Sequence, residues 1–361
     1  MSERSRGFED ASRFTKRVFD DIGSGEIPRT LRRDLKETYE FYLAEDERRR
    51  LATMGRFSRS LYSTWYLVRG LFMKLTALRQ ALVVASVALV WIGMPDNSMQ
   101  VMGGFIFLLF VLGLELKDKL LAKDELEAGR AVQLALMPAT TPQLAGWEIW
   151  LYSVPANDVG GDLIDHMTVS ADDVTLTLGD VAGKGLPAAL MAARLQATVR
   201  ALVPLTENPA HMARELNAIV CRDGLPSKFA SMVHLELGTT SPVVRLVNAG
   251  HQPPMHIHSD GSHTLQKGGP AIGLTPLADY SVTELTMDMD DLLVVYSDGV
   301  TEARNELGRF YTDERFEKLV RYTHGLHSDA LGQRILGSVD DFVQTARKSD
   351  DLSLIVIRRT T

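Results

Sequence analysis

The chain has 361 residues, a formal net charge of −7 at pH 7 and 45% hydrophobic residues. This length predicts two or three folded units, and the acidic balance argues against a nucleic-acid-binding protein. The single cysteine, Cys221, excludes an intramolecular disulfide framework and fits a reducing compartment.

The first segment, residues 1–74, is predicted to be a cytoplasmic helical region. Its first 40 residues are charged and contain no apolar core, so no cleavable signal peptide is expected. Residues 30–51 have the pattern of an amphipathic helix. No catalytic motif lies in this segment, and we interpret it as solvated helical surface.

Two uncharged apolar runs, residues 80–95 and 97–114, follow, with only Asp96 between them. Each is slightly shorter than the ~20 residues that span a bilayer, but snorkelling of Arg79 and Lys117 can lengthen both.

The charges around these runs are asymmetric. Residues 48–79 contain eight Arg or Lys and no acid, whereas the loop at 95–100 contains no basic residue. This positive-inside pattern predicts a two-helix transmembrane hairpin over residues 75–116, in the inner (cytoplasmic) membrane with both ends cytoplasmic. A monotopic hairpin and two buried helices of a soluble domain are the alternatives.

The next segment, residues 117–137, is rich in Leu, Ala, Glu and Lys and has no proline before Pro138. It is predicted to form one continuous linker helix from the membrane to the next domain. The helix is either a spacer or a carrier of signals, and a homodimer formed through it is a further hypothesis.

The remaining residues, 138–361, change to short β-rich runs, several with a period of two. The runs are EIWLYSV, LIDHMTV, DVTLTLGD, ASMVHLEL, VVRLVNAG, YSVTELTM, DLLVVYSD and LSLIVI. Helices are predicted at 186–203, 209–222, 313–322 and 329–347, the first with Pro187 in its opening turn. Many strands with few helices between them predict an antiparallel α+β domain.

Several aspartates of this domain lie at or near the ends of predicted strands. Asp180 and Asp298 each end an apolar strand, Asp350 and Asp351 precede the last one, and Asp162 follows two glycines. Carboxylates that gather at strand ends repel one another unless cations neutralise them, and magnesium or manganese suits oxygen ligands. A single such Asp is as well explained as a turn former, but four together favour a metal site.

Five segments then become recognisable in order: PANDVGGDLID, LGDVAGKGLPAALMAA, NAGHQPP, YSDGVTEAR and SDDLSLIVI. Together, over about residues 126–361, they resemble the PPM-type (type 2C) metal-dependent serine/threonine phosphatases, in the sporulation stage II protein E-like bacterial branch. The resemblance implies a four-layer αββα sandwich of two antiparallel sheets, with two divalent cations, Mn²⁺ or Mg²⁺, at one end.

The resemblance also assigns ligands. Asp162 matches the first family acid, and Asp180 matches the acid that bridges both metals, with the Val181 carbonyl as the backbone ligand beside it. Asp298 and Asp350 match the remaining acids. The implied catalytic reaction is hydrolysis of phosphoserine or phosphothreonine by a water activated between the two metals.

The roles of several residues near these ligands are not assigned. Asp165 and Asp351 are candidates to bind metal through water. Eukaryotic members carry a His where this chain has Ala182 and an Arg near Ala156, so the general acid and the phosphate clamp are not assigned. Lys184 is interpreted either as a phosphate contact or as a surface residue.

The implied partner is a phosphorylated regulatory protein, for which the branch suggests an anti-sigma antagonist of the STAS type. A catalytically degenerate binding module is the alternative function. GGDLID is superficially similar to a nucleotide cyclase signature, but a cyclase does not explain SDGVTEAR or SDDLSLIVI. His251 is interpreted as a turn residue. His256 and His258 share a strand face and are either metal ligands or part of an exposed edge.

Overall fold

The computed structural model describes residues 55–93, 98–138, 140–223, 228–346 and 348–361. The chain divides into two compact units, Met1–Leu120 and Leu121–Thr361. The amphipathic helix expected at residues 30–51 lies outside the described residues.

The described part of the first unit contains α4 (Arg56–Lys74), α5 (Ala77–Gly93) and the beginning of α6 (Ser98–Leu136). Helices α5 and α6 approach closely at Gly104, where an added Cβ would lie 2.7 Å from the Ser86 carbonyl oxygen and 2.8 Å from Val90 Cγ2. Small residues allow such close helix contacts. Arg79 of α5 donates to Glu115 and Asp118 of α6, each over 2.6 Å.

Among the described helices, α6 alone is long and apolar enough to cross a membrane, and α5 is shorter. Of the two membrane spans predicted from the sequence, the second is therefore supported by a helix of sufficient length, and the first corresponds to the shorter helix α5. Apolar side chains such as Phe105, Ile106 and Phe110 on α6 are exposed. Helix α6 also continues without a break through residues 117–136, as expected from a sequence without proline there.

The second unit contains two five-stranded sheets in which every strand pair is antiparallel. The first sheet has the order β1 (Trp147–Val154), β10 (Leu352–Arg359), β9 (Leu292–Tyr296), β6 (Met255–His258) and β7 (Gly261–Thr264). The second has the order β2 (Asp162–Thr168), β3 (Asp173–Val181), β4 (Ala230–Gly238), β5 (Val243–Ala249) and β8 (Thr283–Thr286).

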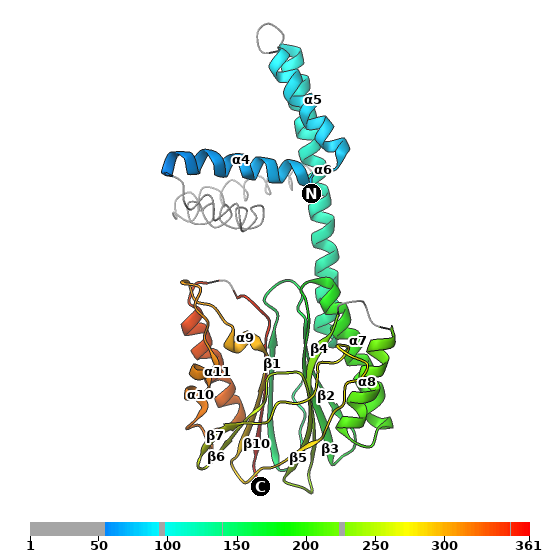
Figure 1. The fold of residues 1–361 in the computed structure, drawn as a ribbon, viewed down its shortest axis with the longest axis vertical. Coiled ribbons are helices and arrows are strands. Elements are labelled where there is room, and N and C mark those ends of the chain that lie inside the picture. Colours follow the sequence, from blue (N-terminus) through cyan, green and yellow to red (C-terminus); the bar gives the residue numbers. More distant parts are fainter. Residues whose placement is uncertain (1–54, 94–97, 139, 224–227, 347) are drawn as a thin grey trace, which may run out of the picture. The chain divides into compact units, whose positions relative to one another are not determined.

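Helices cover the two outer faces of these sheets (Figure 1). Helices α7 (Leu186–Leu202) and α8 (Pro209–Asp223) pack on the second sheet, and α10 (Asp313–Val320) and α11 (Ser328–Val343) pack on the first. Short helical turns are η1 (Val203–Leu205) and α9 (Asp298–Thr301). The expectation of an antiparallel α+β domain with two sheets is confirmed.

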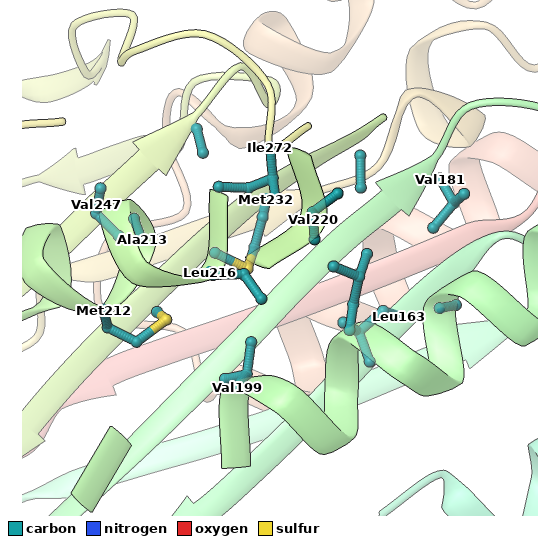
Figure 2. Packing of buried hydrophobic residues seen from close by; sticks show 14 of the residues in the cluster. Leu163, Val181, Val199, Met212, Ala213, Leu216, Val220, Met232, Val247 and Ile272 are labelled. Atoms are coloured by element: carbon teal, nitrogen blue, oxygen red, sulfur yellow. The ribbon is translucent and has the colours of Figure 1, made fainter. Parts of the chain in front are cut away.

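The layers are joined by three apolar clusters. Between the sheets, Leu176 and Leu235 face Ile355. Figure 2 shows the cluster beneath α7 and α8, where Leu163 and Met232 of the sheet lie among helix residues such as Leu216. The central strands also bury polar side chains in mid-strand, where the Thr177 hydroxyl and His234 Nδ1 form a hydrogen bond of 2.8 Å.

Most predicted elements are present, with differences at polar or short segments. Strand β7 was not expected, because its sequence GSHT is short and polar. Helix α9 was also not expected, since four residues give no periodic pattern. Helix α11 ends at Val343 rather than at residue 347. Cys221 lies in α8, as the sequence predicted.

Candidate active site

Two of the expected acids lie on neighbouring strands of the second sheet. Asp162 opens β2 and Asp180 lies at the end of β3, and the strand register places them directly opposite each other. Strand β3 is buried from Val174 to Gly179 and β2 is buried from Asp162 to Asp165, so the two carboxyl groups lie at a largely buried end of the sheet. The sequence therefore positions this pair through strand pairing alone.

The other two acids lie at the matching end of the first sheet. Asp298 follows β9 at the start of α9, and Asp350 lies two residues before the start of β10. The two strands pair, and the Ser297 amide donates to the Ser353 carbonyl over 3.0 Å. Lys184 Nζ lies 2.9 Å from Asp350 Oδ2, so the structure places this lysine beside the acids rather than on a remote surface.

The acids repel each other electrostatically. Burial, followed by the charges of Asp298 and Asp350, raises the pKa of Asp180 to about 7. Burial, followed by the charge of Asp350, raises the pKa of Asp298 to about 6. Burial also raises the pKa of Asp162 well above its usual range, and the charge of Asp180 adds to this. Ionising all of these acids at once is therefore unfavourable unless a cation offsets their charge.

A glycine loop before β2 leaves room beside these acids. A Cβ at Gly161 would lie 3.0 Å from the Val181 carbonyl oxygen and 3.4 Å from Asp180 Oδ1. The loop is held by the Asp351 carboxylate, which accepts from the Ala156 amide over 2.8 Å and from the Gly161 amide over 2.6 Å. Side chains larger than hydrogen at Gly161 would enter the space between the carboxylates and the Val181 carbonyl.

The two neighbouring acids that were considered as water-mediated metal ligands have protein partners of their own. Asp165 was considered a water-mediated metal ligand, but it binds Arg200, whose Nε and Nη2 donate over 2.7 and 2.6 Å. Three positions after Asp162 in a strand, Asp165 points to the opposite face, toward α7. Asp351 was also considered such a ligand, but its two oxygens are used by backbone amides of the glycine loop.

The residues fit a divalent metal centre in chemistry and charge. Asp162 Oδ2 is buried and has no hydrogen-bond partner, and a cation would satisfy it. Burial and the neighbouring carboxylates raise the pKa of Asp180 and of Asp298, and a bound cation would offset both effects. As the side chains stand, no three His, Cys, Asp or Glu of the described residues are placed to hold a metal ion together. This is expected for repelling carboxylates without a cation.

A hollow of about 470 Å³ opens next to the acids. Asp180 and Asp298 form one part of its wall, and Lys267 with Gly268 forms another. A second hollow of about 540 Å³ includes Asp173, at the other end of β3, and therefore lies away from the acid cluster. Of these two hollows, the first therefore adjoins Asp180 and Asp298, whereas the second is lined by other carboxylates, such as Glu236.

His251, expected to be a turn residue, is buried beneath this hollow. Its Nε2 donates to the Tyr296 carbonyl over 3.1 Å, so its Nδ1 accepts from the Ser231 hydroxyl over 2.7 Å. Burial lowers the pKa of His251 to about 4, so the imidazole is neutral and acts as a brace between the two sheets. Its structural interpretation therefore agrees with its contacts.

Sequence patterns gave no signal for Gln133 of α6. Its side-chain amide forms two hydrogen bonds with Gly160, donating to the carbonyl over 2.9 Å and accepting from the amide over 3.0 Å. The end of α6 is also held by Gln196 of α7, which donates to the Leu136 carbonyl over 2.7 Å. The linker helix thus contacts the glycine loop two residues before Asp162.

Comparison with known proteins agrees with this architecture. The family model of Stage II sporulation protein E (SpoIIE) matches residues 170–360. The SiaA-PP2C domain of Pseudomonas aeruginosa has the same fold, with a TM-score of 0.59 and 19% identity over 67% of this chain and 98% of that domain.

Two curated relatives are similar in sequence. Phosphoserine phosphatase RsbU of Bacillus subtilis is 28% identical over 66% of this chain and 70% of its own length. Protein IcfG of Synechocystis is 26% identical over 65% of this chain, and the matched part spans 41% of IcfG.

The two sheets, their flanking helices and the acids at one end define a serine/threonine phosphatase domain of the PP2C type. The chain belongs to the SpoIIE family.

Proposed function

We propose that the protein is a membrane-tethered, metal-dependent phosphatase that removes phosphate from phosphoserine or phosphothreonine of a regulatory protein. The observation that carries this proposal is the gathering of four aspartates at one end of the sandwich, two of them with pKa values raised to about 7 and about 6. The similarity to a phosphoserine phosphatase supports the substrate class.

In this proposal, the acids Asp162, Asp180, Asp298 and Asp350 and the Val181 carbonyl hold two divalent cations, Mn²⁺ or Mg²⁺. Bound cations would acidify a water and neutralise charge on the phosphoryl oxygens. The paired strand ends fix the carboxylates, so little reorganisation accompanies the reaction.

Substrate phosphate needs a positive group as well. The eukaryotic arginine clamp is absent, because residues 156–158 before the first acid are Ala, Asn and Asp. Lys184 lies beside Asp350, and Lys267 lines the adjacent hollow. We propose Lys184 as the phosphate contact, with Lys267 placed to meet the surrounding peptide chain. The partner protein would be a phosphorylated STAS-type antagonist, as the family branch suggests.

The full-length chain should release phosphate from a phosphoserine peptide and from p-nitrophenyl phosphate when Mn²⁺ or Mg²⁺ is supplied. Released phosphate and peptide mass measure the reaction directly. A catalytically degenerate binding module would bind the phosphopeptide without turnover, so binding without phosphate release under either metal would replace the proposed function with that alternative.

Membrane attachment is proposed from α6 and its exposed apolar surface, together with the positive-inside charge pattern. The full-length protein should sediment with membranes, stay there in high salt and carbonate, and enter solution only with detergent. Both termini should be inaccessible to protease added outside intact cells. Recovery of the intact chain in the soluble fraction without detergent would contradict the tether.

Control of the enzyme is proposed to pass through α6. The helix has no Gly/Ser-rich break, and its Gln133 holds Gly160 of the loop before Asp162. A rigid helix transmits displacement, whereas a flexible segment absorbs it. Two arrangements that differ by a few kcal/mol are sufficient to bias activity.

A flexible Gly-Ser segment inserted between residues 122 and 123 should therefore change phosphatase activity in membranes while leaving a chain that starts at residue 126 unaffected. The insertion lies upstream of Gln133, so the contact with Gly160 is retained. Insertion of a seven-residue helical segment, about two turns, is the matched control because it preserves both stiffness and approximate phase. If both insertion variants and the parent have equal activity in membranes, the helix serves only as a tether.

A further inference from the structure

Three histidines gather on the β6–β7 hairpin, at the edge of the first sheet. His256 and His263 are directly opposite each other in the register, and His258 follows His256 on the same face. Their ring centres are 5.1, 5.3 and 5.4 Å apart. His256 pairs with Leu293 near the start of β9, whereas Asp298 follows the other end of that strand, so this histidine group is separate from the acid cluster.

The surroundings of His256 orient its ring for metal binding. It is 6% exposed, and its Nε2 lies 2.9 Å from Asp291 Oδ2, so Nε2–H donates to the carboxylate. The remaining nitrogen, Nδ1, is buried and has no hydrogen-bond partner. Burial lowers the pKa of His256, which keeps the ring neutral. A neutral imidazole held from behind by a carboxylate is the arrangement that metal-binding histidines use.

The supporting carboxylate is itself fixed. Asp291 Oδ2 also accepts from the Asp288 amide over 3.0 Å, and its Oδ1 lies 3.4 Å from His324 Nε2. Asp291 is buried, and its neighbour Leu292 opens β9. The His256 ring is therefore oriented by a rigid part of the sheet, and its free Nδ1 has no competing partner.

We propose that His256, His258 and His263 form a binding site for a zinc-class divalent cation. Zinc binds imidazole nitrogen at about 2.0–2.1 Å, which places each ring centre about 3.2 Å from the metal. Two rings at a tetrahedral angle then have centres about 5 Å apart, close to the observed separations. A solvent molecule completes four ligands at the exposed rim.

The side chains reach this geometry by rotating. As the side chains stand, no three His, Cys, Asp or Glu of the described residues are placed to hold a metal ion, so binding requires the outer rings to rotate. His263 is exposed and His258 is partly exposed, so both can turn without disturbing the core. His258 gives up a long hydrogen bond of 3.3 Å from the Asp260 amide. The buried His256 stays in place.

The bound metal would join the edge strand β7 to β6, and through Asp291 to the start of β9. An edge strand has unpaired backbone groups and is the part of a sheet most easily lost. The proposed site is thus structural. It would stabilise the β6–β7 hairpin, and it is separate from the cations proposed for the acid cluster.

The test uses purified full-length protein without a polyhistidine tag, in excess Mg²⁺ to fill the carboxylate site. Zn²⁺ is titrated in competition with a chromophoric chelator. We expect one zinc per chain, and at least a ten-fold loss of affinity in His263→Ala and in His256→Ala. Asp291→Asn should weaken binding by about 10–100-fold, the usual effect of losing a carboxylate behind a histidine. Cobalt in place of zinc should give the strong visible absorption of a tetrahedral site.

His211→Ala removes an exposed histidine from α8 and should leave zinc affinity unchanged. His263 is exposed, so its alanine variant keeps the fold, which thermal unfolding without metal verifies. Zinc affinity that is unchanged in His263→Ala, or zinc that is lost only in Asp180→Asn, would overturn the proposal and assign the metal elsewhere. Absence of any zinc binding in excess Mg²⁺ would overturn it as well.

Discussion

Asp180→Asn is expected to lower the rate of phosphopeptide hydrolysis by a factor on the order of 10²–10³ or more, the scale on which loss of one electrostatic catalytic group is felt. Asp180 lies opposite Asp162 and close to the charges of Asp298 and Asp350. In the proposed two-metal site, it is the carboxylate expected to serve both cations. The amide keeps the shape of the side chain but removes its charge, so both metals should bind more weakly.

Folding of this variant should survive. The pKa of Asp180 is raised to about 7, so the native state favours the protonated form, and its stabilising effect is lost as pH rises through that value. Asparagine resembles the protonated form, and the metal-free thermal unfolding midpoint at pH 8 should therefore equal or exceed that of the parent. Activity at saturating Mn²⁺ is the measurement.

Asp173→Asn supplies the matched control. Asp173 begins the same strand at its far end, is exposed, and accepts a hydrogen bond from the Ser170 hydroxyl over 2.8 Å. The chemical change is identical, but the acid cluster is not touched, so activity should stay near that of the parent. A parental rate for Asp180→Asn at saturating Mn²⁺ would show that Asp180 does not hold the metals.

Removal of divalent metal should abolish turnover altogether. Four carboxylates without cations repel the phosphate dianion, and Lys184 alone cannot offset them. Dialysis against a chelator should reduce phosphate release to background, and addition of Mn²⁺ or Mg²⁺ should restore it. Persistence of full activity in chelator, with metal content verified as below one per chain, would exclude a two-metal reaction.

The chelator experiment also distinguishes the two proposed metal sites. The histidine site is expected to prefer zinc, and its His263→Ala variant should recover activity with Mg²⁺ as the parent does. Loss of Mg²⁺-dependent recovery in that variant would mean that the hairpin metal supports catalysis.

Much of the fold could be predicted because the buried strands have simple patterns. Strands such as β3 and β10 are continuous apolar runs, and the acids that end or precede them are visible in the sequence. Strand β7 could not be predicted because its residues are polar and it lies at a sheet edge. The hairpin of two membrane spans stays a prediction, since α5 is shorter than a typical span.

The sequence predicted which acids gather at the candidate site, but it did not predict the contacts that hold the surrounding loop in place. Strand ends identify Asp162 and Asp180 because pairing brings strand ends together. Asp351 was visible too, but its use as an anchor for Gly161 depends on a contact across 190 positions. Likewise, the Arg200 partner of Asp165 is set by how α7 packs on β2. Local patterns do not contain such contacts, since they depend on tertiary packing.

Strand β10 lies between β1 and β9, although it is made after both of them. On the ribosome, a nascent chain that has reached residue 345 already has Asp162, Asp180 and Asp298, yet its first sheet lacks an interior strand. The anchor of the glycine loop, Asp351, is also still to come. Because these contacts join distant positions, closure is expected to be slow and late. The acid cluster and the anchor of its glycine loop are therefore complete only when residues 350–359 have been synthesised.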